Sequence, residues 1–255
     1  TRRSSDLWGE GTFMDLLLDA DILACQFAYA YEASRGWDAN GSLDMDDASW
    51  AISGFDSAVE RILSETGTEN VLLCFTSRGN FRYSVLPTYK FNRRGKPKPV
   101  LLDALIEHAW EVWECKAMDC LEADDVMGIM ATRSPGCYVI ATIDKDLKQI
   151  PGIQYNWKEE RVKDVKSSEA DYWFYFQVLT GDSTDGYAGC PGIGVCRART
   201  VLKGVTEDPW ARVVAAFESR GLTEEDALVQ ARVARILRAD DYDFQERQPI
   251  LWSPD

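Results

Sequence analysis

Continuous apolar runs recur along this chain and alternate with longer amphipathic segments. The runs are "MDLLLDAD" at 14–21, "NVLLCFT" at 70–76 and "CYVIATI" at 137–143, and "IQYNW" at 153–157 is a candidate fourth. Strands that are covered on both faces show this continuous apolar pattern, whereas half-exposed strands alternate apolar and polar residues. The sequence therefore predicts an α/β fold with a mostly parallel sheet that is flanked by helices.

The segments between and after these runs predict the helices. They lie at 46–67, 100–113 and 121–133. After about residue 166 the pattern becomes helical, with "SSEADYWFYFQVLTG", a glycine-rich turn, "CRARTVLKG" and two further helices at about 207–219 and 223–239. No Pro/Ser-rich linker separates the parts. We therefore expect one compact unit with an α/β region at 1–165 and a helical region at 166–255.

Composition excludes several classes of protein. The chain has 255 residues, 45% of them hydrophobic, which is enough for a substantial core. No apolar run approaches the roughly 18 residues of a membrane span, and Arg2-Arg3 is not followed by the apolar core of a signal peptide. The seven cysteines form no C-x-x-C pair, so reduced thiols are expected rather than a zinc site. These features predict a cytoplasmic protein without a membrane partner.

The charge is distributed unevenly. The net charge of −14 argues at first against nucleic acid, because an acidic protein repels a polyanion. However, residues 70–102 contain seven basic and no acidic side chains, so this segment carries +7 and the remainder −21. A basic island in an acidic chain is compatible with a local nucleic-acid contact.

Acidic side chains cluster at predicted strand ends and helix starts. Because ligand sites of open α/β sheets lie at the carboxyl ends of the strands, we expect these acids to meet at one edge. Two carboxylates about 5 Å apart repel by roughly 3 kcal/mol at an effective dielectric near 20, so the cluster needs cations. Hard oxygen ligands without histidine or thiolate favour two Mg²⁺ or Mn²⁺ ions over zinc. Taken singly, each acidic motif is also compatible with an ordinary loop or capping turn. The candidate ligands are Asp19, Glu122, Asp124, Asp125, Asp144, Asp146, Asp182 and Asp185, with Asp21 beside them.

The basic segment "FRYSVLPTYKFNRRGKPK" (81–98) interleaves cations with aromatic residues. Cations neutralise phosphates and aromatic faces stack on unpaired bases, which together suit a single-stranded nucleic-acid end. A solvated basic loop is the alternative. The turn "GCPGIGVCRAR" (189–199) could bring backbone amides close to a phosphate, although an ordinary helix connection fits equally well. The candidate contacts are Arg78, Arg82, Tyr83, Tyr89, Arg94, Lys96, Gly189, Gly192, Gly194 and Arg197.

With these motifs in this order, the chain resembles the 5′ nucleases of the flap endonuclease superfamily, most closely the replication exonucleases of T7-like podoviruses. The matching segments are "LLLDAD", "FRYSVLPTYKFNRR", "LEADDVMG", "ATIDKDLKQIP" and "LTGDSTDGYAGCPGIG", with "ARILRADDYDF" and "ILW" near the end. The resemblance implies a PIN-like, Rossmann-like catalytic region and metal ions held by the eight acids.

The resemblance also assigns roles to the two other motifs. Residues 78–98 would form a helical arch in which Lys90 and Arg93 act on the scissile phosphate, with Tyr89 beside them. The glycine turn would be a helix-two-turn-helix motif that grips duplex DNA and can bind a monovalent cation. The implied protein is a monomeric, Mg²⁺-dependent 5′→3′ exonuclease and flap nuclease for phage DNA replication, acting on 5′ ends or flaps of duplex DNA and on RNA primers in RNA:DNA hybrids, in the cytoplasm of the bacterial host.

One position departs from the pattern of the family. Ser77 stands where these nucleases carry an aspartate after the second strand, and Asp21 is a candidate substitute. A catalytically weak or silent DNA-end-binding protein is therefore the alternative function. A PIN-type ribonuclease is a third, but the helical C-terminal region argues against it. The only histidine, His108, lies in a predicted amphipathic helix, which excludes chemistry with a histidine base.

Overall fold

The computed structural model describes residues 14–35, 45–204 and 208–254. Its centre is a six-stranded sheet with the order β3-β2-β1-β4-β5-β6, in which only β6 runs antiparallel to its neighbour. The predicted α/β fold with a mostly parallel sheet is confirmed. The strands are β1 (Asp15–Asp19), β2 (Val71–Cys74), β3 (Cys115–Lys116), β4 (Tyr138–Ala141), β5 (Gly152–Asn156) and β6 (Arg161–Val165). The sequence pattern missed β3, which has two residues, and β6, a polar edge strand.

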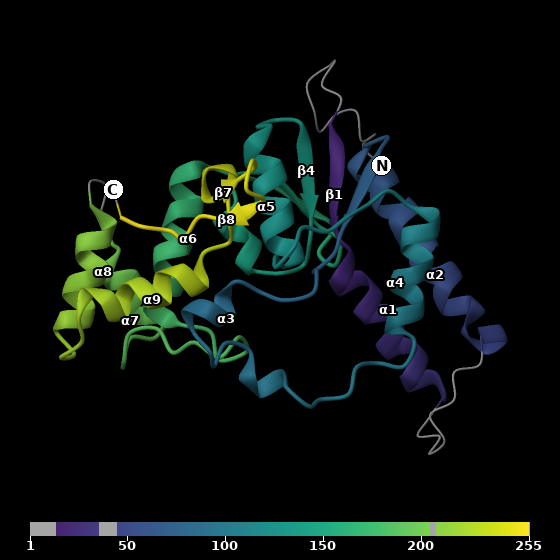
Figure 1. The fold of residues 1–255 in the computed structure, drawn as a ribbon. Coiled ribbons are helices and arrows are strands. Elements are labelled where there is room, and N and C mark those ends of the chain that lie inside the picture. Colours follow the sequence, from purple (N-terminus) through teal and green to yellow (C-terminus); the bar gives the residue numbers. More distant parts are fainter. Residues whose placement is uncertain (1–13, 36–44, 205–207, 255) are drawn as a thin grey trace.

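Helices cover both faces of the sheet (Figure 1). Leu16 and Leu18 of β1 belong to the same buried core as α1 (Ala20–Arg35), α2 (Met45–Thr66) and α4 (Leu102–Val112). Leu17, whose side chain points to the opposite face, packs in a second core with α5 (Ala123–Arg133). This explains the continuous apolar runs. The sequence pattern did not predict α1. This helix follows β1 without an intervening loop, so no turn residues mark where it begins.

The C-terminal third forms a third core from four helices: α6 (Ser167–Thr180), α7 (Val195–Val201), α8 (Pro209–Glu218) and α9 (Glu224–Ala234). The chain is not helical to its end. After α9 it returns to the sheet, where Ile236, Leu237 and Tyr242 join the core under α5, and it finishes in the 3₁₀ turn η4 (Ala239–Asp241) and the short strands β7 (Tyr242–Asp243) and β8 (Gln248–Pro249). The predicted helix at 223–239 therefore ends early. Residues 1–13 of the predicted α/β region lie outside the described residues.

The basic segment 78–98 is mostly irregular, although a helical arch was implied. Its regular parts are α3 (Arg82–Val85) and the 3₁₀ turn η2 (Phe91–Arg93), and the segment runs as a strap from α3 to the start of α4 (Figure 1). Pro87 and Pro97 restrict longer helices here. The middle of the strap is fixed, because the Lys90 amide donates to the Asp185 carbonyl at 2.7 Å and the Asn92 side chain donates to the Ser183 carbonyl at 3.0 Å. Among the described residues, no helix is long and apolar enough to cross a membrane.

Candidate active site

A pocket of about 610 Å³ opens at the carboxyl ends of β1 and β4, the central strands of the sheet. In the sheet, β2 and β3 lie on one side of β1, and β4, β5 and β6 lie on the other side. The chain therefore changes direction across the sheet between β1 and β4, which makes this the topological switch point. Open α/β sheets bind their ligands at such a point, because the loops on either side diverge there. The predicted acids meet in this pocket, with one exception.

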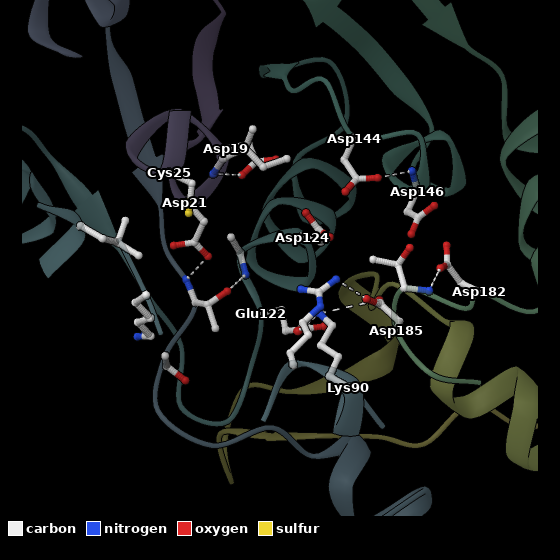
Figure 2. Close-up of a pocket in the computed structure, with 18 of the residues that line it drawn as sticks. Asp19, Asp21, Cys25, Lys90, Glu122, Asp124, Asp144, Asp146, Asp182 and Asp185 are labelled. Carbon is white, nitrogen blue, oxygen red and sulfur yellow. Dashed lines mark hydrogen bonds and ion pairs between the residues drawn. The ribbon is translucent and has the colours of Figure 1, made fainter. Parts of the chain in front are cut away.

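The acids reach the pocket from four separate segments (Figure 2). β1 ends at Asp19, α5 begins beside Glu122 and Asp124, the loop after β4 supplies Asp144 and Asp146, and the turn after α6 supplies Asp182 and Asp185. The Asp146 amide donates to Asp144 Oδ1 at 2.8 Å, and the Thr184 amide donates to Asp182 Oδ1 at 2.7 Å. These local turns fix where the carboxylates stand relative to the sheet.

Burial makes the ionised form of several of these acids unfavourable. Burial, together with the charge of Asp21, raises the pKa of Asp19 to about 7. Burial and the neighbouring Asp144 raise the pKa of Asp146 to about 7. Burial and the charge of Asp19 also raise the pKa of Asp124 well above its ordinary value. A site that keeps buried acids together is electrostatically unfavourable unless a cation joins them.

Four basic side chains, Arg82, Lys90, Arg93 and Lys145, pair with the other acids. Lys90 forms an ion pair with Glu122 and lies 3.7 Å from Asp185, and Arg93 contacts Asp185 at 2.6 Å. Burial would raise the pKa of Glu122, but Arg82 and Lys90 outweigh it and hold that pKa below its ordinary value.

On the other side of the pocket, Lys145 donates to Asp182 at 2.8 Å. Here too burial acts to raise the pKa of Asp182, but the Lys145 hydrogen bond and the Thr184 amide lower it overall. With the side chains of the described residues in these positions, no three carboxylate, thiol or imidazole groups converge closely enough to hold one metal ion. Binding of a metal ion would therefore require some of these carboxylates to move closer together.

Uncharged groups orient further acids, and the sequence pattern had not singled them out. The Thr142 hydroxyl donates to Asp19 Oδ2 at 2.9 Å and accepts from the Asp144 amide at 2.9 Å, so it links the ends of β1 and β4. The Thr76 amide donates to Asp21 Oδ2 at 3.0 Å. Asp21, the suggested substitute for the missing aspartate, therefore lines the pocket near Ser77. The signal for Thr142 was its place two residues before Asp144 at a strand end.

Asp125 is the exception among the predicted ligands. Its side chain is fully buried on the other side of α5 and accepts two hydrogen bonds from Arg82, at 2.7 and 2.8 Å. The Leu237 amide donates to it as well, at 3.1 Å. Because Asp124 and Asp125 are adjacent on a helix, their side chains point in different directions, and only Asp124 faces the pocket. The structure gives Asp125 the role of anchoring the strap to α5.

The predicted nucleic-acid contacts of the basic segment divide into two groups. Arg82 and Tyr89 are 3% and 2% exposed and do not form part of the surface. The Tyr89 hydroxyl donates to Glu122 Oε2 at 2.8 Å and to Asp185 Oδ2 at 3.1 Å. Arg78 lines the pocket, and Tyr83 is 41% exposed with the Arg94 guanidinium over its ring. Lys96 is also exposed.

The glycine turn lies apart from the acidic pocket, before α7. Gly194 is the N-cap residue of α7, and Arg197 donates to the Gly192 carbonyl at 2.6 Å. Gly189 has a structural function, since a Cβ placed on it would lie 2.3 Å from the Gly181 amide nitrogen. Its φ of +66° also favours glycine. These contacts fix the turn at the end of α6.

The donor set fits hard divalent cations. All the acids in the pocket offer carboxylate oxygens, and the described residues bring no histidine into its lining. The Cys25 thiol also lines the pocket, but burial and the charge of Asp21 raise its pKa, and a protonated thiol is a poor metal ligand. The carboxylate oxygens suit Mg²⁺ or Mn²⁺, and a bound cation would offset the burial and mutual repulsion that raise the pKa values of Asp19, Asp124 and Asp146.

Comparison with known proteins agrees with this geometry. The profile of the family described as "5'-3' exonuclease, N-terminal resolvase-like domain" matches residues 15–172. The chain belongs to this 5′-3′ exonuclease family. It is 30% identical to the "Exonuclease" of Escherichia phage T7, over 94% of this chain and 93% of that protein. It is also 30% identical to the "Exodeoxyribonuclease" of Enterobacteria phage T3, over 94% and 92% of the two chains. As a member of the 5′-3′ exonuclease family, it is a nuclease.

Solved structures confirm the fold. The T5 D15 protein co-crystallised with metal ions superposes with a TM-score of 0.67 at 13% identity, over 86% of this chain and 88% of that one. The bacteriophage T5 D15 flap endonuclease, in a pseudo-enzyme-product complex with DNA and metal ions, gives a TM-score of 0.66 at 14% identity over the same shares. These superpositions, at 13% and 14% sequence identity, show that the chain has the PIN-like architecture of these nucleases.

Proposed function

We propose that this protein is a Mg²⁺- or Mn²⁺-dependent 5′→3′ exonuclease and 5′ flap nuclease that acts on duplex DNA. The observation that supports it most is the meeting of Asp19, Asp124, Asp144 and Asp182 in one pocket, beneath a strap that carries Lys90 and Arg93. The seven predicted acids in the pocket would hold the metal, Asp125 being excluded by its pairing with Arg82. RNA:DNA hybrids are included in the proposed substrates, and a monomer is the proposed state.

Different residues of the chain would have different roles in phosphodiester hydrolysis. Bound divalent ions supply Lewis acidity at the phosphate. Lys90 and Arg93 face the acids across the pocket, so they can exchange Glu122 and Asp185 for phosphate oxygens and stabilise the charge that develops there. Exposed Tyr83 and Arg94 of the strap would contact the 5′ end, and the turn at 189–194 would grip the duplex backbone, with a monovalent cation where one is bound.

A direct assay tests the proposal. Duplex DNA labelled at its 5′ end is incubated with the protein and Mg²⁺ or Mn²⁺, alongside a 5′-flap substrate and an RNA:DNA hybrid. We expect short 5′ products that disappear when EDTA is added. Intact label with both metals, at protein concentrations that shift the duplex in a gel, would refute the nuclease function.

Lys90→Ala is expected to lower kcat about 100-fold and to change the duplex Kd less than about 3-fold, because Lys90 acts on transition-state charge inside the pocket. Single-turnover kinetics and fluorescence anisotropy measure the two quantities. Lys96→Ala is the matched control for kcat, which it should leave unchanged, since Lys96 belongs to the same strap but is exposed outside the pocket. Equal losses of rate and affinity in Lys90→Ala would make Lys90 a phosphate anchor only.

Ser77 supports a second candidate, a DNA-end-binding protein with little or no turnover. Ser77 lines the pocket, where its hydroxyl accepts from the Leu121 amide at 3.3 Å, and it brings no carboxylate. If the missing acid limits metal binding, Ser77→Asp will lower the half-saturating Mg²⁺ concentration about 10-fold. Titration of Mg²⁺ at fixed duplex concentration measures it. A Ser77→Asp variant that binds duplex without any cleavage would favour the silent protein.

A further inference from the structure

A buried chain of two glutamine amides leads from Asp146 into the C-terminal region. Gln177 donates through Nε2 to Asp146 Oδ1 at 2.6 Å. Gln149 in turn donates to Gln177 Oε1 and to the Ala234 carbonyl, the latter at 2.8 Å. The Ile236 amide donates to Gln149 Oε1 at 3.4 Å. The two glutamines are only 8% and 1% exposed, so solvent does not replace these contacts.

Local structure explains why the three side chains meet. Asp146 and Gln149 are the first and last residues of the 3₁₀ helix η3 (Asp146–Gln149). Residues three apart in such a helix lie one above the other, so both side chains face the same neighbour, α6. Gln177 stands on α6 between buried Phe176 and Val178, where an apolar residue would pack without needing a partner. A buried amide is tolerated here because its hydrogen bonds are made.

Asp146 has a neutral donor at 2.6 Å, whereas its nearest cation, Lys145, lies farther away at 3.8 Å and is mostly exposed. Glu122 and Asp185 contact Lys90 and Arg93, which add positive charge to the pocket. The Gln177 amide is neutral, so it can fix the rotation of the Asp146 carboxylate without repelling a metal ion. Because Oδ1 is held, the direction of Oδ2 is determined as well.

We propose that Gln177 is a positioning residue, whose amide holds Asp146 in the orientation that binds a divalent metal ion, and that Gln149 holds the Gln177 amide in turn. This inference rests on the proposed metal-dependent function. It extends the site to α6 and to the end of α9, neither of which contributes a residue to the lining of the pocket. Partners of this kind alter metal affinity by about 10- to 100-fold in metalloproteins.

Calorimetric titration with Mn²⁺ alone, without DNA, tests the inference on the full chain. Gln177→Met should weaken Mn²⁺ binding about 10-fold. Gln149→Met should weaken it at least about 3-fold, and the double variant should match Gln177→Met alone, because Gln149 acts only through Gln177. Gln230→Met is the matched control. Gln230 accepts a hydrogen bond from the Gly189 amide at 2.8 Å and does not contact the acids. The Mn²⁺ affinity of the Gln230→Met variant should therefore equal that of the wild type.

In nuclease assays, the half-saturating Mn²⁺ concentration should rise in Gln177→Met, while KM for duplex stays constant. If wild-type protein binds no Mn²⁺, the proposed function itself fails. If wild type binds Mn²⁺ and folded Gln177→Met binds it within about 2-fold, the positioning role is refuted and the nuclease function stands. Should circular dichroism show that Gln177→Met is unfolded, Gln149→Met decides, and unchanged Mn²⁺ affinity there refutes the proposal.

Discussion

Replacing Asp146 with asparagine is expected to lower kcat on the order of 1,000-fold while the protein stays folded. Asp146 lies in the acidic pocket, and an amide in its place removes one of the charges that would hold the metal. Asp144→Asn should behave in the same way. Single-turnover cleavage of 5′-labelled duplex measures the loss, and circular dichroism checks the fold.

The same substitution should stabilise the metal-free protein at high pH. The pKa of Asp146 is raised from 3.8 to about 7 in the folded chain, so its contribution to stability is fully present below the unfolded value and is lost as the pH rises to about 7. Wild-type protein in EDTA should therefore unfold at a lower temperature at pH 8 than at pH 5. Asp146→Asn should reduce that difference.

Asp164→Asn provides the control, because Asp164 lies on edge strand β6 with a side chain 54% exposed. It should change neither kcat nor the pH dependence. A large fall in the melting temperature of metal-free Asp146→Asn at pH 8 would show that the acids in the pocket do not repel one another as described.

Replacing Arg82 with leucine is expected to destabilise the protein by about 3–5 kcal/mol, because it leaves the Asp125 carboxylate buried without a counter-charge. Arg82 also donates to the backbone carbonyls of Val233 and Arg235, at 2.9 and 2.6 Å. One side chain thus joins the strap, the start of α5 and the end of α9. Urea denaturation measures the change, which corresponds to roughly 10 °C in Tm for a chain of this size.

Two further variants make the Arg82 prediction specific. Arg94→Leu, in the exposed part of the same strap, should change stability by no more than about 0.5 kcal/mol. The double variant Arg82→Leu/Asp125→Leu should recover part of the loss, since it removes the buried charge together with its partner. A double variant that recovers none of the loss would mean that the Arg82 contacts with the carbonyls of Val233 and Arg235, which both variants lack, dominate over the ion pair.

Local patterns were sufficient for the elements that bury continuous apolar runs. β1, β2 and β4 lie where the runs predicted them, because strands covered on both faces give continuous apolar runs. β5 also lies at its predicted place, although it is mostly half-buried and contains polar residues. Strand β6 was not predicted, because its sequence "RVKDV" is largely polar. Such a sequence is possible in a strand here because β6 lies at the edge of the sheet and pairs only with β5. The arch was expected to be helical from resemblance, but its prolines leave only short helical turns.

For the site, the sequence identified which acids stand at strand ends and helix starts, and the structure brings seven of them into one pocket. It could not separate Asp124 from Asp125, because adjacent helical residues differ only in the direction of their side chains. Nor could it distinguish Arg82 from the exposed cations of the strap, since its partners Asp125, Val233 and Arg235 lie 43 to 153 residues away.

The sequence by itself determined the α/β architecture, the placing of acids at strand ends and helix starts, and the basic character of residues 78–98, because each depends on periodicity or on residues close together in the chain. Only the tertiary structure decided which charged groups face the pocket and which form buried ion pairs away from it, as Arg82 and Asp125 do. That division depends on contacts among β1, α5, α6 and the segment after α9, which are distant in sequence, and a linear pattern contains no record of such contacts.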